Sequence, residues 1–176
     1  MRKRTTLLGV TMAGILGVGL YGGSVLATPA TGLTTTPIAT KIAFNPFEVK
    51  THTRPPAAFW QLKLAARGLT DGYVVDNKLA PVDPSTGAVS STGWHQHPGP
   101  SLVFVIAGTV SDYEADDPTC TAQTYTAGQG FVDSGHGAHI LRNEGTVAAE
   151  TIAVQLVPKD AARKIDVPQA PGNCPF

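Results

Sequence analysis

The sequence predicts an all-β fold, an antiparallel sandwich or barrel, and three observations support this. Short segments of alternating or continuous apolar residues recur at even spacing, and turn signals such as Asp71-Gly72 and Asn143-Glu144-Gly145 separate them. No long segment carries the 3.6-residue period of an amphipathic helix. The chain has 176 residues and no internal repeat, so we expect one small domain.

Residues 1–27 are expected to be a secretory signal peptide. Basic residues 2–4 precede a long apolar run that ends on Val25-Leu26-Ala27, small residues of the kind that signal peptidase cleaves after. An uncleaved membrane anchor is the alternative, but six glycines weaken this run as a spanning helix. No cysteine follows the leader directly, so we expect no lipid anchor there. The protein is expected to be secreted or extracytoplasmic.

The charge balance argues against nucleic acid as a partner. The chain has 13 basic and 13 acidic residues, and three of the basic ones lie in the leader. Without them, ten basic residues face 13 acidic ones, a net charge of −3. Such a chain has no basic surface that would attract nucleic acid or an anionic membrane.

Two cysteines, Cys120 and Cys174, are expected to form a disulfide, because oxidation is the default in an exported chain. The bond would close a loop of about 55 residues and stabilise the fold by roughly 4 kcal/mol on the chain-entropy model. Two unpaired thiols are the alternative.

Residues 28–40 are small, polar and proline-bearing, so they are expected to be a flexible linker before a domain that spans 41–176. Residues 47–53 alternate as an edge strand would. Residues 57–67 suit a helix or a strand, and we favour a strand because the segment is short. The proline-rich C-terminal tail is expected to be irregular and fixed by Cys174.

Residues 101–107 read as a strand that is apolar on both faces, and hence buried on both sides. A tight hairpin is expected at Gly108, followed by return strands over 109–113 and 123–126. The acidic residues that follow lack the ligand spacing of a calcium loop, so we expect a solvated hairpin end (Asp112, Glu114, Asp116 and Asp117). Residues 150–157 form the clearest late strand.

His95 and His97 are two residues apart, so on a strand both imidazoles project to the same side. Such a pair is half of a metal site that needs ligands from another strand. A second cluster, His136-Gly-Ala-His139, follows about forty residues later, and we expect His139 to complete the site. His136 has the opposite strand parity, so we expect it at the rim, as an outer-sphere residue at most.

The chain from about Gly87 to Asn143 resembles the cupin superfamily, whose small barrel carries two signature stretches. In the first stretch His95, His97 and Gly108 fall in register, but Ser101 occupies the position of the family's glutamate. The second stretch also matches in part. Its matching residues are Gly128, His139 and Asn143, whereas Ser134 and His136 replace the family's proline and glycine.

The resemblance implies an antiparallel double-stranded β-helix, or jelly roll, with His95, His97 and His139 as metal ligands. The carboxylate ligand is missing, although the Ser101 hydroxyl shares the parity of the histidines and would face the cavity. Three imidazoles favour iron, zinc, nickel or copper over manganese. The uncompensated 2+ charge would favour a small anionic or chelating guest. Cupins commonly pair through sheet edges, so a homodimer is a further expectation.

Two functions remain open on this basis. The first is a dioxygenase-like reaction on a small substrate, although the sequence names neither the substrate nor a general base. The second is a non-catalytic extracellular module that binds a metal or a small ligand, since altered motifs often mark a retained fold with changed chemistry. A copper–zinc superoxide dismutase-like sandwich also uses Gly-x-His-x-His, but it needs more histidines than the five present.

Overall fold

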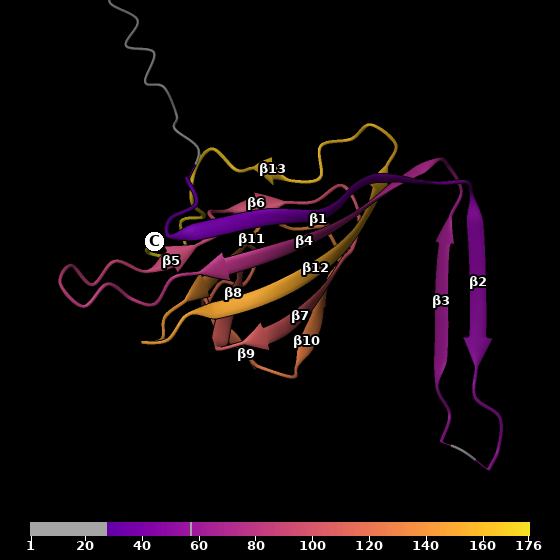
Figure 1. Cartoon of the computed structure of the whole chain (residues 1–176), viewed down its shortest axis with the longest axis horizontal. Coiled ribbons are helices and arrows are strands. Elements are labelled where there is room, and N and C mark those ends of the chain that lie inside the picture. The colour runs from indigo at the N-terminus through magenta and orange to yellow at the C-terminus, as the bar shows by residue number, and fades with distance from the viewer. Residues whose placement is uncertain (1–27, 57) are drawn as a thin grey trace, which may run out of the picture.

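The computed structural model describes residues 28–56 and 58–176, so the expected signal peptide lies outside the described residues. In this part of the chain all the regular secondary structure is β-strand. The strands form two layers with a projecting arm (Figure 1). The expected all-β antiparallel fold is therefore confirmed. Within the described ranges, no helix is long and apolar enough to span a membrane.

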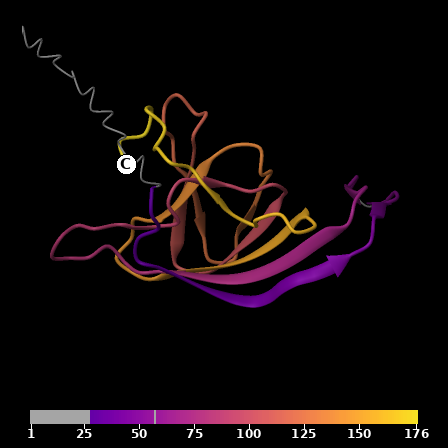
Figure 2. The same cartoon turned by 90° about the horizontal axis from the view of Figure 1, so that it is seen from above.

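The first layer is an antiparallel sheet of five strands in the order β1-β4-β12-β7-β10. Its long strands curve beneath the second layer (Figure 2). The strands are β1 (Leu33–Phe44), β4 (Thr70–Leu79), β12 (Ala149–Pro158), β7 (Ser101–Ala107) and β10 (Gly130–Asp133).

The second layer runs in the order β13-β6-β11-β8-β9, with a short additional strand, β5, paired to β11. Its strands are β5 (Ser90–Ser91), β6 (His95–Gln96), β8 (Thr109–Glu114), β9 (Gln123–Thr126), β11 (His139–Asn143) and β13 (Ile165–Asp166). Apolar side chains from both layers form the core between them, in two groups (Leu79, Val105, Val110, Leu141 and Ala149; Val75, Val103 and Ala153).

The turn at Gly108 is a corner between the layers, and the expected tight hairpin at this position was wrong. β7 pairs with β12 and β10, whereas β8 pairs with β11 and β9, so the chain changes sheets at this glycine. Gly108 has φ +68°, and a Cβ there would lie 2.4 Å from the carbonyl oxygen of Ala148. Both facts require glycine, because an L side chain would be strained and would clash.

The expectation of a flexible linker over 28–40 also differs from the structure. Residues 33–44 form β1, which pairs along β4. The segment is rich in threonine, and β-branched residues suit strands. Pro37 is accommodated because β1 is an edge strand and its register shifts just after this residue. The first layer therefore includes residues that the composition assigned to a linker.

The arm is a hairpin of β2 (Phe47–His52) and β3 (Gln61–Ala66), which pair only with each other. The two strands expected in this region are thus present. Cross-strand pairing places Val49 opposite Leu64 and Phe47 opposite Ala66, so one face of the arm is mostly apolar. A two-stranded hairpin with an uncovered apolar face has little stability of its own in water.

The C-terminal tail covers the outer side of the second layer. A disulfide joins Cys120 to Cys174, and Cys174 packs with Trp94, Tyr113 and Ile140. The indole of Trp94 is fully buried, and its Nε1 donates a hydrogen bond to the carbonyl oxygen of Phe176 at 2.8 Å. The tail is thus fixed against the strands that carry the histidines.

Candidate metal centre

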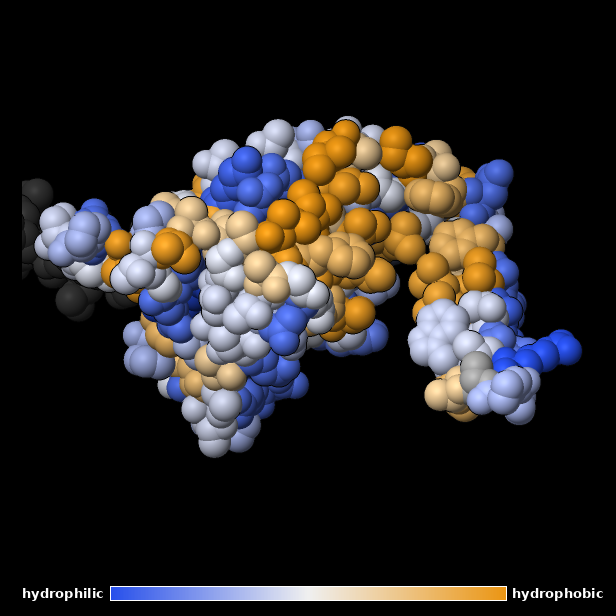
Figure 3. Space-filling model, turned by 60° about the horizontal axis from the view of Figure 1, so that its bottom comes forward, coloured by the Kyte–Doolittle hydropathy of each residue, from blue (hydrophilic) through white to orange (hydrophobic). Residues whose placement is uncertain are grey.

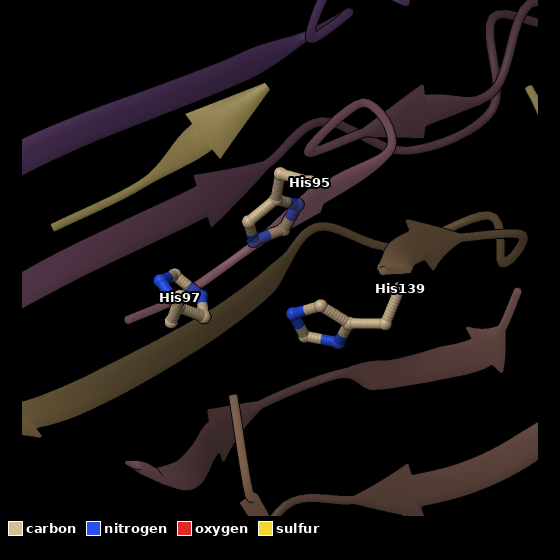
Figure 4. Close-up of side chains that lie close together, drawn as sticks. All are labelled: His95, His97 and His139. Atoms are coloured by element: carbon tan, nitrogen blue, oxygen red, sulfur yellow. The ribbon is translucent and has the colours of Figure 1, made fainter. Parts of the chain in front are cut away.

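Three histidines meet on the inner side of the second layer (Figure 4). His95 lies in β6 directly opposite His139 of β11, because these two strands pair at this position. His97 follows β6 on the same side of the chain as His95, two residues away. The ring centroids lie 4.5 Å apart for His95 and His139, 4.8 Å for His95 and His97, and 5.7 Å for His97 and His139.

Each imidazole is held through its Nδ1 atom. Nδ1 of His95 lies 2.8 Å from the carbonyl oxygen of Gly93, and Nδ1 of His139 lies 2.9 Å from Oδ1 of Asp112. Nδ1 of His97 contacts the carbonyl oxygen of Arg163 in the C-terminal segment. These acceptors favour a proton on Nδ1, which leaves the Nε2 lone pairs of His95 and His139 available to bind a cation. Nε2 of His97 lies 3.4 Å from the side-chain nitrogen of Gln155, which would have to give way to an ion.

Neighbouring carboxylates, rather than burial, make the pKa of His139 differ from those of the other two rings, since each ring is at most 5% exposed. Burial, and then the charges of the neighbouring histidines, hold the pKa of His95 well below its ordinary value of 6.5. Burial also lowers the pKa of His97. Burial acts in the same direction on His139, but the hydrogen bond and charge of Asp112, with the charge of Asp133, raise its pKa overall.

A row of polar residues from the first layer faces the histidines. Gln155 of β12 pairs with Ser101 of β7, and Ser101 pairs with Asp133 of β10. All three are at most 6% exposed. The Ser101 hydroxyl faces the cavity, as its parity predicts, and accepts a hydrogen bond from Nε2 of Gln155 at 3.1 Å.

Two buried polar atoms in this cluster lack a hydrogen-bond partner, namely Nε2 of His139 and Oδ2 of Asp133. They lie 3.8 Å apart, and Oδ2 lies 3.7 Å from Nε2 of His97. Leaving such atoms unpaired is costly, so an unsatisfied pair implies a missing partner. Two ligands that each lie about 2.1 Å from one ion are roughly 3.0–3.4 Å apart. The observed separations of 3.7 and 3.8 Å are slightly longer than this, so the donors would draw together around an ion. Imidazole nitrogen and carboxylate oxygen are donor types that suit a divalent metal.

The histidines line a small cavity of about 50 Å³ between the layers. Thr151, Gln155 and Ser101 contribute polar groups to its wall, and the cationic residues Arg163 and Lys164 also line it. The cavity is therefore polar and positively charged on one side, and it has room for only one or two water-sized groups.

The other candidate residues lie elsewhere. His136 is exposed and does not line the cavity. Asn143 is buried, and its side chain closes the turn after β11 by accepting from the Gly145 amide and donating to the carbonyl oxygen of Val147. Asn143 therefore stabilises the backbone of this turn and does not line the cavity.

Sequence reasoning missed two carboxylates, Asp112 and Asp133. Asp112 was expected in a solvated hairpin end, yet it is 3% exposed and orients His139. A signal was available in each case, because Asp112 shares strand parity with Val110, and Asp133 with Phe131. A carboxylate at the parity of inward apolar residues indicates a buried partner.

Comparison with known proteins gives likenesses to solved structures at low sequence identity. No family model and no curated protein matches the chain. Among solved structures, it is similar to a conserved protein of unknown function from Streptococcus pyogenes (18% identity, 50% of this chain and 66% of that chain, TM-score 0.40). It is also similar to a cupin superfamily protein from Desulfitobacterium hafniense (13%, 49% and 67%, 0.40). A third is a protein with a double-stranded β-helix domain from Klebsiella pneumoniae (16%, 70% and 85%, 0.44). This chain thus spans just under two thirds of the first of these structures.

Proposed function

We propose that this protein is an exported cupin that binds one divalent transition metal through His95, His97 and His139. The observation that carries the proposal is the convergence of three buried rings whose Nδ1 atoms are already engaged. Imidazole donors favour iron, zinc, nickel or copper. A bound metal of this kind supplies Lewis-acid chemistry to a ligand that reaches it.

The guest of the site is a small anionic or chelating molecule. Arg163 and Lys164 line the cavity beside the histidines, and their positive charges add to that of the metal. Gln155 already hydrogen-bonds to Ser101 and Arg163, and Lys164 pairs with Asp166. The nearby positive charges would still attract an anionic guest, whereas a neutral apolar guest would gain nothing from them. The small volume of the cavity limits the part of the guest that enters it.

A dioxygenase-like oxidation is the reaction class that we propose. Its test is to load metal-free protein with Fe(II) and to follow O₂ consumption with diketones, flavonols and thiols. Consumption that depends on both substrate and metal would support turnover. Flat traces with all three classes would count against it.

The alternative is a non-catalytic module that binds a metal or a small ligand outside the cell. One observation favours it, because a cavity of about 50 Å³ does not admit a flavonol without movement of its walls. This alternative predicts a stoichiometric ligand in the purified protein and no product.

The metal itself is tested by elemental analysis of unheated native protein beside a His139→Ala variant. We expect about one equivalent of metal in the wild type and far less in the variant. Absence of metal from the wild type, together with no binding on titration, would overturn the proposal.

Export is proposed from the leader, and the Cys120–Cys174 disulfide suggests an oxidising compartment. Mass spectrometry of protein recovered from the producing cells tests it. A mature chain that begins at Thr28 is expected, whereas retention of residues 1–27 on membrane-bound protein would favour the anchor.

We also propose that the chain forms a homodimer through the outer face of the first layer. β7 has the sequence of a strand buried on both faces, yet Leu102, Phe104 and Ile106 are 37–52% exposed. Apolar residues cover this face and continue toward the arm (Figure 3). The arm itself presents a largely uncovered apolar face.

A second copy of the chain would cover both the outer face of β7 and the apolar face of the arm. In a two-fold arrangement the same apolar surfaces of each copy cover those of the other, and the interface closes. Light scattering after gel filtration tests this: a mass of two chains is expected, and a monomer at micromolar concentration would contradict it.

A further inference from the structure

We propose that Asp133 is a fourth metal ligand, which supplies from β10 the carboxylate that is absent at position 101. This inference rests on the proposed metal site and extends it. Ser101 and Asp133 are direct cross-strand neighbours on β7 and β10, and both point between the layers. The carboxylate is thus displaced by one strand and remains within reach of the histidines.

The geometry of the carboxylate gives its two oxygens different roles. Oδ1 accepts a hydrogen bond from the Gly135 amide at 2.8 Å, which orients the group. Oδ2 is buried, has no hydrogen-bond partner, and lies 3.7 Å from Nε2 of His97 and 3.8 Å from Nε2 of His139. The free oxygen therefore lies beside the same two nitrogen atoms that would bind the metal.

The turn after Asp133 is packed against the turn after His97. Gly135 has φ +79°, and a Cβ there would lie 2.7 Å from the carbonyl oxygen of His97 and 2.6 Å from that of Gly99. Only glycine allows this approach. The contact fixes the distance between Asp133 and His97, so the carboxylate is positioned before a metal arrives.

A carboxylate ligand changes the metal that the site prefers. Three neutral imidazoles leave a bound divalent ion with its full charge, whereas Asp133 reduces the net charge of the site to +1. Oxygen donors suit manganese and iron(II), and imidazoles alone favour zinc and copper. The site would then accept Mn²⁺ as well as the iron, zinc, nickel or copper expected from three histidines.

The test titrates metal-free wild-type protein and an Asp133→Asn variant with Mn²⁺, Zn²⁺ and Co²⁺. The amide retains an oxygen for the Gly135 amide but loses the charge. We expect affinity for Zn²⁺ to fall at least about tenfold and affinity for Mn²⁺ to fall further. The visible spectrum of bound Co²⁺, which reports its donor set, should also change.

Asp83→Asn is the matched control, because Asp83 accepts a backbone amide in the same manner at a turn remote from the histidines. It should bind all three ions as the wild type does. In an Asp133→Asn background, Ser101→Glu should restore Mn²⁺ binding, because it returns a carboxylate to the neighbouring strand.

The outcomes separate this inference from the proposed function. Equal affinities and an unchanged Co²⁺ spectrum in Asp133→Asn would overturn the role of Asp133 and leave the three-histidine site intact. Wild-type protein that binds none of the ions would overturn both. If the variant does not fold, a crystal structure of the Zn²⁺-loaded wild type decides, since a ligating Oδ2 lies about 2.0–2.2 Å from the ion. A separation above about 3 Å would refute ligation.

Discussion

Strand β7 has two faces that meet different surroundings. Its inner face begins with Ser101, which is 1% exposed and hydrogen-bonded to Gln155, and continues with the core residues Val103 and Val105. Its outer face carries Leu102, Phe104 and Ile106, all exposed. One strand thus buries a polar side chain among apolar ones on its inner face, and leaves three large apolar side chains exposed on its outer face, where burial would favour covering them.

This difference separates two roles of the first layer. Near Ser101 the inner face carries polar groups, in place of apolar packing, and these groups surround the histidines. The outer face keeps a surface that a soluble single chain rarely exposes over a continuous area. If the two roles are independent, changes on one face leave the function of the other unaffected.

The largest effect is expected from His139→Ala. Loss of one of three imidazoles should reduce metal affinity by more than about 100-fold, beyond the effect of removing an outer-sphere group. Isothermal titration with Zn²⁺ measures it. His136→Ala is the control, because His136 is exposed outside the cavity and should bind as the wild type does. Dimer mass should be the same in both variants, and a monomeric His139→Ala protein would show that the two faces are coupled.

Removal of the disulfide by Cys120→Ser with Cys174→Ser should lower the free energy of unfolding by roughly 4 kcal/mol on the chain-entropy model. The bond links residues 54 apart in sequence and anchors the tail over Trp94, on the side of the molecule opposite the exposed face of β7. Denaturant unfolding provides the measurement. A loss of less than 1 kcal/mol would show that packing alone holds the tail.

Phe104→Glu should weaken the dimer by about 2 kcal/mol or more, because it places a charge at the centre of the apolar outer face. Sedimentation equilibrium measures the change. Thr124→Glu introduces the same charge at an exposed position of β9 in the other layer and should leave the dimer intact. Metal content should not differ between the two variants. A dimer that tolerates Phe104→Glu would place the interface elsewhere.

A further effect concerns pH. A proton competes with the metal for Nε2 of His139, and Asp112 keeps the pKa of His139 above 6.5, so metal affinity should fall as pH drops through that raised pKa. His95 and His97, with lowered pKa values, compete only at more acidic pH.

Asp112→Asn should therefore move the onset of metal loss to lower pH, while it weakens affinity about 10- to 100-fold at pH 8 because the ring is less well oriented. Metal titrations across pH 5–8 measure both effects. An unchanged onset would show that Asp112 does not control the protonation of His139.

The features of this fold that could be predicted from the sequence are those that depend on local residue patterns. Strand periodicity predicted the fold class, and the parity of His95 and His97 predicted that both face one cavity. His139 lies beside them because β11 pairs with β6, as the motif spacing implied. These features depend on residues close in sequence or on a recognised spacing.

What the sequence did not reveal depends on pairing between distant strands. Asp133 is important because it lies opposite Ser101, a relation set by the register of β10 on β7. Asp112 is important because β8 pairs with β11. Composition also misled at β1, where threonines that resemble a linker pair with β4. Register is a property of the folded sheet, so single-strand patterns do not contain it.

The contact between the His97 ring and the carbonyl oxygen of Arg163 makes the orientation of that ring depend on a segment outside the long strands. Arg163 lies between β12 and β13, so the acceptor that orients His97 belongs to an irregular stretch of the chain. Proteolytic cleavage in this stretch would release the ring while the long strands stay paired.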